Sequence, residues 1–384
     1  MKKVLLLDTN VSSFPIYNFL VESGYEVYVA GGKPSDCLAK YTDNYINIDY
    51  SNLYFLEDII NAYDFDFLVP GCNDMSYISA TRVNSKNKFY GLDTTEISEI
   101  INNKSKFRKF AIDNNLNVPM VYTKDEIYQL NNPIIIKPAD AYSGRGVSIV
   151  KDINKSNIDT AIENAINYSK NKECVIEEYV EGQLYSHTAF ISDKKIIIDF
   201  FVIEDCTANK FTVDTSYVVN DFPDEIKNEI KNQIEFIASK LDLVDGLIHT
   251  QFIKTENSFK IIEVTRRCPG DLYSDLIKIS TDFDYAEYYT KPFINQKIYI
   301  DKFERKENSI IRHTISSSEI LNYIGIQFNE NIEIKSFIPL SITGDQLKES
   351  PFGRLGIVFI NCIDGDKLKQ LYSIILKRQL YKFN

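Results

Sequence analysis

The chain has 384 residues, more than one hydrophobic core usually serves, so we expect two or three packed domains. Its hydrophobic fraction of 44% and charged fraction of 25% are typical of a soluble globular protein. The 43 lysines and arginines against 54 aspartates and glutamates give a formal charge of -11, which argues against nucleic acid or an anionic membrane as a partner.

Cysteine and histidine are sparse and scattered along the chain. The six cysteines form no CxxC pair and there are only three histidines, so we expect neither a zinc site nor a disulfide framework, and a reducing cytoplasm is favoured. The apolar run at residues 4–7 is too short for a signal peptide, and no later run is long enough to span a bilayer.

Residues 1–95 alternate strand and helix patterns in the manner of an open α/β sheet. Strands are predicted at residues 4–7, 26–30, 45–48, 65–69 and 89–92, and helices at residues 12–23 and 53–63. The first crossover carries Asp8-Thr9-Asn10, so the GxGxxG dinucleotide fingerprint is absent. Asn73 and Asp74 follow a strand, where such sheets place ligand groups, but a helix cap by Asp74 explains them equally well.

Apolar residues recur at helical spacing across residues 95–115, and this stretch contains a basic run, residues 103–108, that includes Lys104. A basic run on a helix usually forms a solvated face. Val118-Pro119 then breaks the helical pattern and leads into an extended segment.

A predicted hairpin at residues 133–150 is the first candidate for a phosphate site. Its apolar first strand ends on Lys137 and Pro138, so the lysine lies at the edge of a rigid element. The turn that follows contains Ser143, Gly144, Arg145 and Gly146. Its two glycines allow backbone N–H groups to face an anion, in an order that differs from the Walker loop. Taken alone, the pattern also fits an ordinary hairpin beside a surface lysine.

A further strand, at residues 174–176, runs into an acidic and aromatic segment. This segment consists of Glu177, Glu178, Tyr179, Val180 and Glu181, and Gly182 follows it. An extended backbone here can offer a carbonyl and an N–H group to the edge of an adenine. An ordinary strand end with solvated acids is the alternative interpretation of this stretch alone.

Two later strands, at residues 246–253 and 260–265, are joined by a turn and carry polar residues. Their spacing can bring Gln251 and Glu263 to neighbouring positions, and strand alternation places Glu263, Thr265 and Arg267 on one face. Oxygen donors beside an arginine suit magnesium and phosphate. Between these motifs, residues 190–203 predict two strands and residues 225–241 an amphipathic helix.

Four motifs follow one another along the chain: Lys104, Lys137 with its glycine turn, residues 177–180, and residues 263–267. In this order they resemble the ATP-grasp superfamily, whose familiar branches are biotin carboxylase, D-alanine ligase and the L-amino acid ligases. The resemblance covers residues 1 to about 300 and implies a mixed α/β and α+β fold. An N-terminal open α/β domain (1–95) would precede the ATP-grasp domain (96–298), with a glycine-rich lid at about 118–180. Residues 299–384, with strands at 310–315, 332–337 and 356–360, are similar to the small β-rich C-terminal domain of biotin-carboxylase-like members.

The resemblance also implies roles for the residues of the motifs. Lys104 and Lys137 would hold the α- and β-phosphates of ATP, with the turn at residues 143–146 covering the γ-phosphate and residues 177–181 binding adenine. The implied metal ligands are Gln251, Glu263 and Thr265, for Mg²⁺ with Mn²⁺ as a substitute. Arg267 would steady the transferred phosphoryl group, and we expect Arg267 and Lys137 to act in catalysis.

Three positions depart from the pattern of the superfamily. Leu184 stands where many members carry an acid for the ribose, so Glu181 or a later residue must replace it. Gln251 stands in place of a glutamate at the first metal-ligand position, and Thr265 in place of the usual asparagine. One negative charge is therefore missing, which affects the expected number and affinity of the metal ions.

The resemblance implies an ATP-dependent carboxylate-amine ligase that acts through an acyl phosphate and forms ADP and phosphate. Its partners would be a small carboxylate and an amine or other nucleophile, and the C-terminal unit would close the substrate cleft or pack a homodimer. Two alternatives remain: a small-molecule kinase on the same fold, and a nucleotide-binding protein with reduced turnover, which Gln251 suggests.

Overall fold

The computed structural model describes residues 1–142 and 144–384, and Ser143 lies outside them. An N-terminal parallel sheet has the strand order β3-β2-β1-β4. Its strands are β1 (Lys3–Leu7), β2 (Glu26–Gly31), β3 (Tyr45–Asn47) and β4 (Phe67–Pro70), and its helices are α1 (Phe14–Glu22), α2 (Cys37–Tyr41), α3 (Leu53–Tyr63) and α4 (Asp74–Val83), with a 3-10 turn η1 (Val11–Ser13) before α1. β1 is apolar and buried on both faces, as in a sheet covered by helices on both sides.

The strand predicted at residues 89–92 is wrong. The side chain of Asn84 forms hydrogen bonds with both backbone polar groups of Phe89. Asn84 Oδ1 accepts from the Phe89 N–H, and Asn84 Nδ2 donates to the Phe89 carbonyl. The backbone of Phe89 is therefore satisfied by a side chain and is not available to a neighbouring strand.

The helical stretch predicted over residues 95–115 is two helices, α5 (Thr95–Asn102) and α6 (Lys104–Asp113). Asn103 has an extended backbone between them and accepts the N–H of Lys106 through its side chain. It therefore ends one helix and caps the next. Because the helical path is interrupted at Asn103, α6 begins at Lys104.

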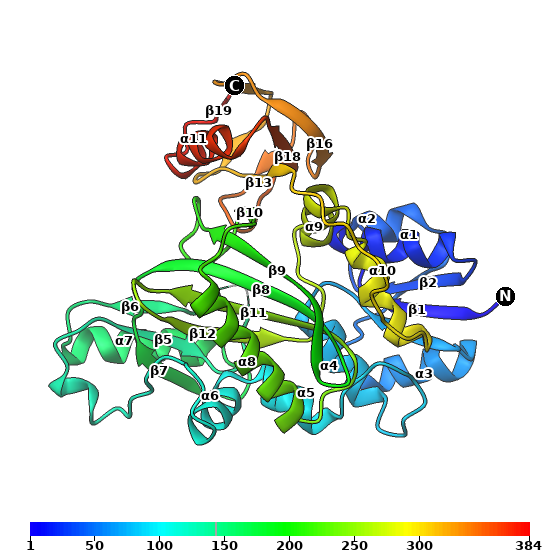
Figure 1. Cartoon of the computed structure of the whole chain (residues 1–384), viewed down its shortest axis with the longest axis horizontal. Coiled ribbons are helices and arrows are strands. Elements are labelled where there is room, and N and C mark those ends of the chain that lie inside the picture. The colour runs from blue at the N-terminus through cyan, green and yellow to red at the C-terminus, as the bar shows by residue number, and fades with distance from the viewer. Residues whose placement is uncertain (143) are drawn as a thin grey trace.

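The predicted hairpin forms part of a three-stranded sheet of order β6-β5-β7, which we call the lid. It contains β5 (Ile134–Pro138), β6 (Ser148–Val150) and β7 (Cys174–Glu178), and α7 (Lys155–Tyr168) packs on it through the apolar side chains of Ile158, Ala161 and Ala165. A 3-10 turn, η2 (Ile127–Gln129), precedes β5. In Figure 1 the lid lies on the side of the molecule opposite the N-terminal sheet.

An eight-stranded sheet of order β12-β11-β8-β9-β10-β13-β18-β16 runs from the centre of the molecule into the C-terminal region at the top of Figure 1. Its first part contains β8 (Gln183–Ser192), β9 (Lys195–Asp205), β10 (Thr215–Val219), β11 (Gly246–Lys254) and β12 (Phe259–Thr265). Its second part contains β13 (Ser309–Ile315), β16 (Glu333–Pro339) and β18 (Gly356–Cys362). β10 pairs with β13, so one sheet continues from the central region into the C-terminal region.

Helices cover both faces of this large sheet. α8 (Asp224–Lys240) packs on one face through Ile230, Ile234 and Ile237. On the other face, α9 (Tyr273–Thr281), α10 (Tyr285–Thr290) and the turn η3 (Lys291–Ile294) join a core that extends to the N-terminal sheet. In the C-terminal region α11 (Gly365–Leu376) packs on the sheet, beside the short pairs β14 (Leu321–Asn322) with β17 (Gln346–Leu347) and β15 (Ile326–Phe328) with β19 (Tyr381–Phe383).

Among the described residues, no helix has both the length and the apolar character needed to cross a membrane.

Candidate active site

Between the lid and α6, three charged side chains from separate elements meet and form the group that we call the lid cluster: Arg108, Lys137 and Glu177. Glu177 Oε1 accepts from Arg108 Nε at 2.7 Å and Glu177 Oε2 accepts from Lys137 Nζ at 2.8 Å. All three are buried. Although burial favours the neutral acid, the two cations lower the pKa of Glu177 to about 2. Burial lowers the pKa of Lys137, and Glu177 opposes this shift.

The lid cluster explains why the basic run on α6 is only partly a solvated face. Lys106 and Lys109 are exposed, but Arg108 is buried and its Nη2 also donates to the carbonyl of Ile262 at 2.6 Å. Sequence reasoning missed Arg108. Its signal was its position four residues after Lys104, which places both side chains on one helix face.

Lys104 lies at the first turn of α6 and points toward the end of the large sheet. Its ammonium donates to the carbonyl of Ala141 at 3.0 Å and lies 3.4 Å from Glu263 Oε1. It also lies 5.3 Å from the centroid of the Tyr142 ring. A lysine thus joins the segment after β5 to a carboxylate on β12, so it can contact an anion held between the lid and the large sheet.

The register of β11 and β12 pairs Gln251 directly with Glu263, as their spacing predicts, and pairs His249 with Thr265. Glu263 and Thr265 are two residues apart and therefore share a face. Burial opposes ionisation of Glu263, but Lys104 and Arg267 lower its pKa, so this carboxylate is charged near neutral pH. An amide, a carboxylate and a hydroxyl on neighbouring positions provide hard oxygen donors, and this set fits Mg²⁺.

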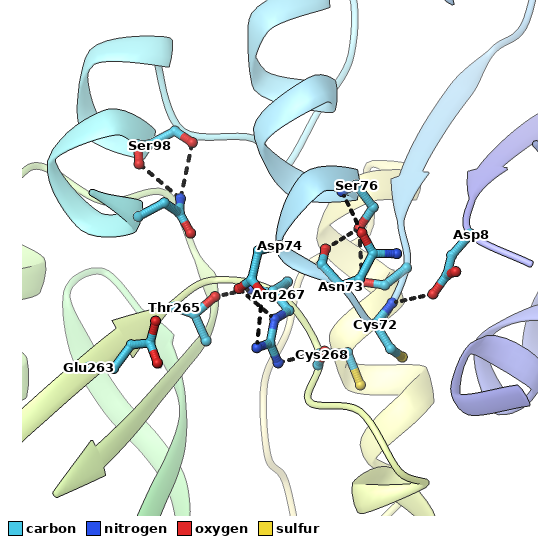
Figure 2. A network of polar contacts seen from close by, with 12 residues as sticks. Asp8, Cys72, Asn73, Asp74, Ser76, Ser98, Glu263, Thr265, Arg267 and Cys268 are labelled. Atoms are coloured by element: carbon cyan, nitrogen blue, oxygen red, sulfur yellow. Dashed lines mark hydrogen bonds and ion pairs between the residues drawn. The ribbon is translucent and has the colours of Figure 1, made fainter. Parts of the chain in front are cut away.

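Arg267 follows β12 and forms an ion pair with Asp74 at the start of α4, with 2.9 Å between Nε and Oδ1 (Figure 2). The helix cap is Asn73, whose side chain accepts the N–H of Ser76, so the alternative of a cap by Asp74 is wrong. Burial disfavours the charged guanidinium, but Asp74 outweighs it and raises the pKa of Arg267. Asp74 therefore holds the arginine in place beside Glu263 and Thr265, as Figure 2 shows.

A further set of polar side chains crosses one face of the large sheet, and we call it the polar row. From β12 to β13 it consists of Glu263, Gln251, Ser186, Glu204, Ser216 and Arg312. Gln251 Nε2 donates to Glu204 Oε2 at 2.7 Å, and Arg312 Nε donates to Ser216 Oγ at 2.8 Å. Burial raises the pKa of Glu204, and hydrogen bonds from Gln251 and Ser186 oppose that rise. Sequence reasoning missed Glu204 and Arg312.

In the segment predicted to bind adenine, two backbone N–H groups already have partners. Glu178 donates its N–H to the carbonyl of Met120 at 2.9 Å, and Tyr179 donates its N–H to the carbonyl of Pro133 at 3.1 Å. Glu178 also accepts the Met120 N–H through its side chain. These bonds hold the end of β7 extended next to Val180 and Glu181. The side chain of Glu181 is exposed.

The turn of the lid has two glycines with left-handed backbones, Gly144 at φ +68° and Gly146 at φ +72°. A Cβ on Gly144 would lie 2.3 Å from Phe211 Cβ, so the glycine allows the lid to contact the loop between β9 and β10. The backbone and side chain of Arg145 both donate to the carbonyl of Tyr142. The role predicted for Ser143 falls outside the described residues.

A family model for the ATP-grasp domain matches residues 130–275. A D-alanine–D-alanine ligase of Helicobacter pylori is 30% identical over 156 residues, which are 38% of this chain and 43% of that protein. The carbamoyl phosphate synthase large chain of Clostridium botulinum is 25% identical over 145 residues, or 37% of this chain and 13% of that one. The chain thus spans less than half the length of these curated relatives.

Solved structures match over the whole chain. The L-amino acid ligase from Bacillus licheniformis has a TM-score of 0.81 at 15% identity, covering 100% of this chain and 98% of that one. The phosphoribosylglycinamide synthetase from Anaerococcus prevotii has a TM-score of 0.76 at 19% identity, covering 100% and 99%. These matches confirm the predicted mixed α/β fold, and the domain match supports the predicted resemblance to the ATP-grasp superfamily over residues 130–275.

Proposed function

We propose that the chain is an ATP-dependent ligase that joins a small carboxylate to an amine or another nucleophile and releases ADP and phosphate. The observation that carries the proposal is the meeting of Lys104, Glu263 and Arg267 at the end of β12, facing the lid. Two cations beside a charged carboxylate suit a bound triphosphate and its metal ion, and phosphoryl transfer mainly requires charge neutralisation and positioning.

In this proposal the lid and α6 hold ATP. Lys104 and Lys137 bind the α- and β-phosphates, the turn at residues 143–146 covers the γ-phosphate, and residues 177–181 contact adenine through the backbone. Gln251, Glu263 and Thr265 would hold Mg²⁺, for which Mn²⁺ could substitute. When bound, magnesium neutralises phosphate oxygens. One of the solved neighbours is a complex with MgADP, which supports the use of ATP and magnesium.

The reaction proceeds in two steps. A carboxylate oxygen of the substrate attacks the γ-phosphorus, the bond to the ADP oxygen breaks, and an acyl phosphate forms. The nucleophile then attacks the acyl carbon, phosphate leaves and, for an amine, a proton is lost from nitrogen. Arg267 is positioned by Asp74 near the predicted metal ligands, where it can stabilise charge on the transferred group. The partners are small molecules, and a homodimer and a cytoplasmic location remain predictions.

The test is to screen amino acids, other small carboxylates and sugar acids for release of ADP, and to repeat the active ones with hydroxylamine. Hydroxylamine converts an acyl phosphate to a hydroxamate, so we expect ADP and a hydroxamate from at least one carboxylate. ADP with a stable phosphorylated product and no hydroxamate would instead assign a kinase. Release of AMP would contradict both reactions, and nucleotide binding without turnover would favour the alternative of a nucleotide-binding protein with reduced turnover.

A further inference from the structure

Gln251 lacks the negative charge that a glutamate would bring to its position, but a carboxylate from another strand contacts it. Gln251 Nε2 donates to Glu204 Oε2 at 2.7 Å, although the two residues are 47 positions apart. Glu204 is on β9 and Gln251 on β11, and β8 lies between these two strands in the sheet. The contact therefore spans a whole strand.

The contact is made possible by a small residue on the intervening strand. Ser186 of β8 is the register partner of Gln251, and it is fully buried. On β9 the register partner of Ser186 is Val202, two residues before Glu204, so the longer side chain of Glu204 reaches Gln251 diagonally past the short serine. Ser186 Oγ also forms a hydrogen bond with Tyr273 Oη at 3.0 Å, which fixes the serine beneath the pair.

A serine also lies on the other side of Glu204, and there it is in direct register. Its register partner on β10 is Ser216, and Ser216 is in turn paired with Arg312 on β13. Arg312 is buried and donates to Ser216 Oγ at 2.8 Å. Two serines thus alternate with three long polar side chains. Burial raises the pKa of Glu204, and Arg312 is among the groups that oppose this rise.

The orientation of the Gln251 amide follows from its bond to Glu204. The nitrogen and oxygen of a primary amide are on opposite branches of one planar carbon, so an amide that donates to Glu204 turns its oxygen away from it. β12, which carries Glu263, lies on the opposite side of β11 from β9. The bond to Glu204 therefore uses the amide nitrogen and leaves the amide oxygen as the donor atom that Gln251 can offer to a metal ion.

We propose that Glu204 compensates for the carboxylate that position 251 lacks: it is a positioning residue that accepts a hydrogen bond from the Gln251 amide and so fixes that amide at the predicted magnesium site. The inference rests on the proposed function, because it assumes that Gln251 and Glu263 hold the metal ion. Residues that hold a metal ligand from outside in this way affect metal affinity strongly, typically by 10- to 100-fold.

The proposal predicts that the two side chains can be exchanged. Glu204→Gln removes the carboxylate, Gln251→Glu places two carboxylates side by side, and the double variant Glu204→Gln/Gln251→Glu restores one carboxylate and one amide. The experiment titrates Mg²⁺ by calorimetry into each protein saturated with ADP, after ADP affinity has been measured separately without metal. We expect Glu204→Gln to weaken Mg²⁺ binding by about 10- to 100-fold. The exchanged double variant should recover most of the wild-type affinity.

Asp205→Asn is the matched control, because Asp205 is the next residue of β9 and accepts a hydrogen bond from Tyr372 of α11. It should leave Mg²⁺ affinity unchanged. If Glu204→Gln does not fold, Glu204→Asp keeps the charge but is one methylene too short to reach over Ser186, and it should lose affinity as well. The Gln251→Glu variant completes the comparison, because a carboxylate at position 251 can bind Mg²⁺ by itself. A merely structural role for Glu204 is excluded when Gln251→Glu raises Mg²⁺ affinity more in the Glu204→Gln background than in the wild type.

The outcomes separate the two proposals. Wild-type Mg²⁺ affinity in Glu204→Gln or in Glu204→Asp, or a folded double variant without recovery, would overturn the role of Glu204 and leave the proposed function standing. Absence of Mg²⁺ binding to the wild-type protein with ADP would overturn both.

Discussion

The lid cluster and the polar row both bury charge, but they do so in different ways. In the lid cluster one carboxylate, Glu177, contacts two cations at 2.7 and 2.8 Å, so the charges pair directly. In the polar row Glu204 contacts an amide at 2.7 Å, and its nearest arginine in register, Arg312, is one strand further on, beyond Ser216. The lid cluster is thus a tight ion group, and the polar row is a spaced series.

This difference indicates which part supports the structure and which part can respond to a ligand. A buried carboxylate between two cations is difficult to separate, because loss of one partner leaves an uncompensated charge. A spaced row holds polar groups that can reorganise around a cation or an anion. We therefore expect changes in the lid cluster to act first on stability, and changes near Glu263 to act first on binding.

Substitution of Glu177 should have the largest effect and would test the first half of this comparison. Glu177→Gln leaves Lys137 and Arg108 buried without a counter-charge, so the free energy of unfolding should fall by about 3–5 kcal/mol. The measurement is urea denaturation, with the exposed Glu181→Gln as the control. Equal unfolding midpoints for the two variants would show that the lid cluster contributes no net stability.

The pH dependence of stability would sharpen the same point. The folded-state pKa of Glu177 is about 2, below the ordinary value of 4.5. A lowered pKa gives stability that is fully present above pH 4.5 and lost as the pH falls toward 2. The difference in unfolding free energy between the wild type and Glu177→Gln should therefore be constant above that range and shrink within it. A difference independent of pH would contradict the assigned pKa.

The comparison also separates what could be predicted from the sequence. Lys137 and Glu177 lie on neighbouring strands of one short sheet, where local patterns of apolar residues and glycines predict the lid hairpin. The pairing of Gln251 with Glu263 was also within reach, because a short turn joins their strands. The predicted strand at residues 89–92 failed because the side chain of Asn84 satisfies the backbone there.

Glu204 shows why the rest of the site could not be predicted. Its contact with Gln251 depends on β8 lying between β9 and β11 and on a serine at one register position of β8. Neither the order of strands nor their register follows from local sequence patterns. Asp74 similarly meets Arg267 from 193 positions away in the sequence, and a charged residue at a helix start has a simpler local explanation.

Two lysines on one helix turn test the second half of the comparison. Lys104 faces Glu263 at 3.4 Å, whereas Lys106 is exposed and pairs with Glu99 at 2.6 Å. Lys104→Met should weaken ADP binding by about ten-fold, or 1.4 kcal/mol, with little change in unfolding free energy. Lys106→Met should bind ADP like the wild type. Calorimetric titration with ADP measures both, and equal affinities in the two variants would remove Lys104 from the phosphate site.

The smallest effect concerns the contact between the lid and the loop that joins β9 to β10. Gly144 and Gly24 both have left-handed backbones, at φ +68° and +81°, but only Gly144 meets another segment. A Cβ there would lie 2.3 Å from Phe211 Cβ, and Asp214 holds the loop by accepting the N–H groups of Thr207 and Ala208. The loop therefore has little freedom to move away from an added methyl group.

Alanine at either glycine should cost roughly 1–2 kcal/mol of stability, because an L-residue is strained in this backbone region. Only Gly144→Ala should also prevent the lid from seating against Phe211. The rise in melting temperature on adding ADP with Mg²⁺ should therefore shrink in Gly144→Ala and remain at the wild-type value in Gly24→Ala. Since the control carries the same backbone strain without the contact, equal rises in both variants would show that the lid does not need this contact to hold the nucleotide.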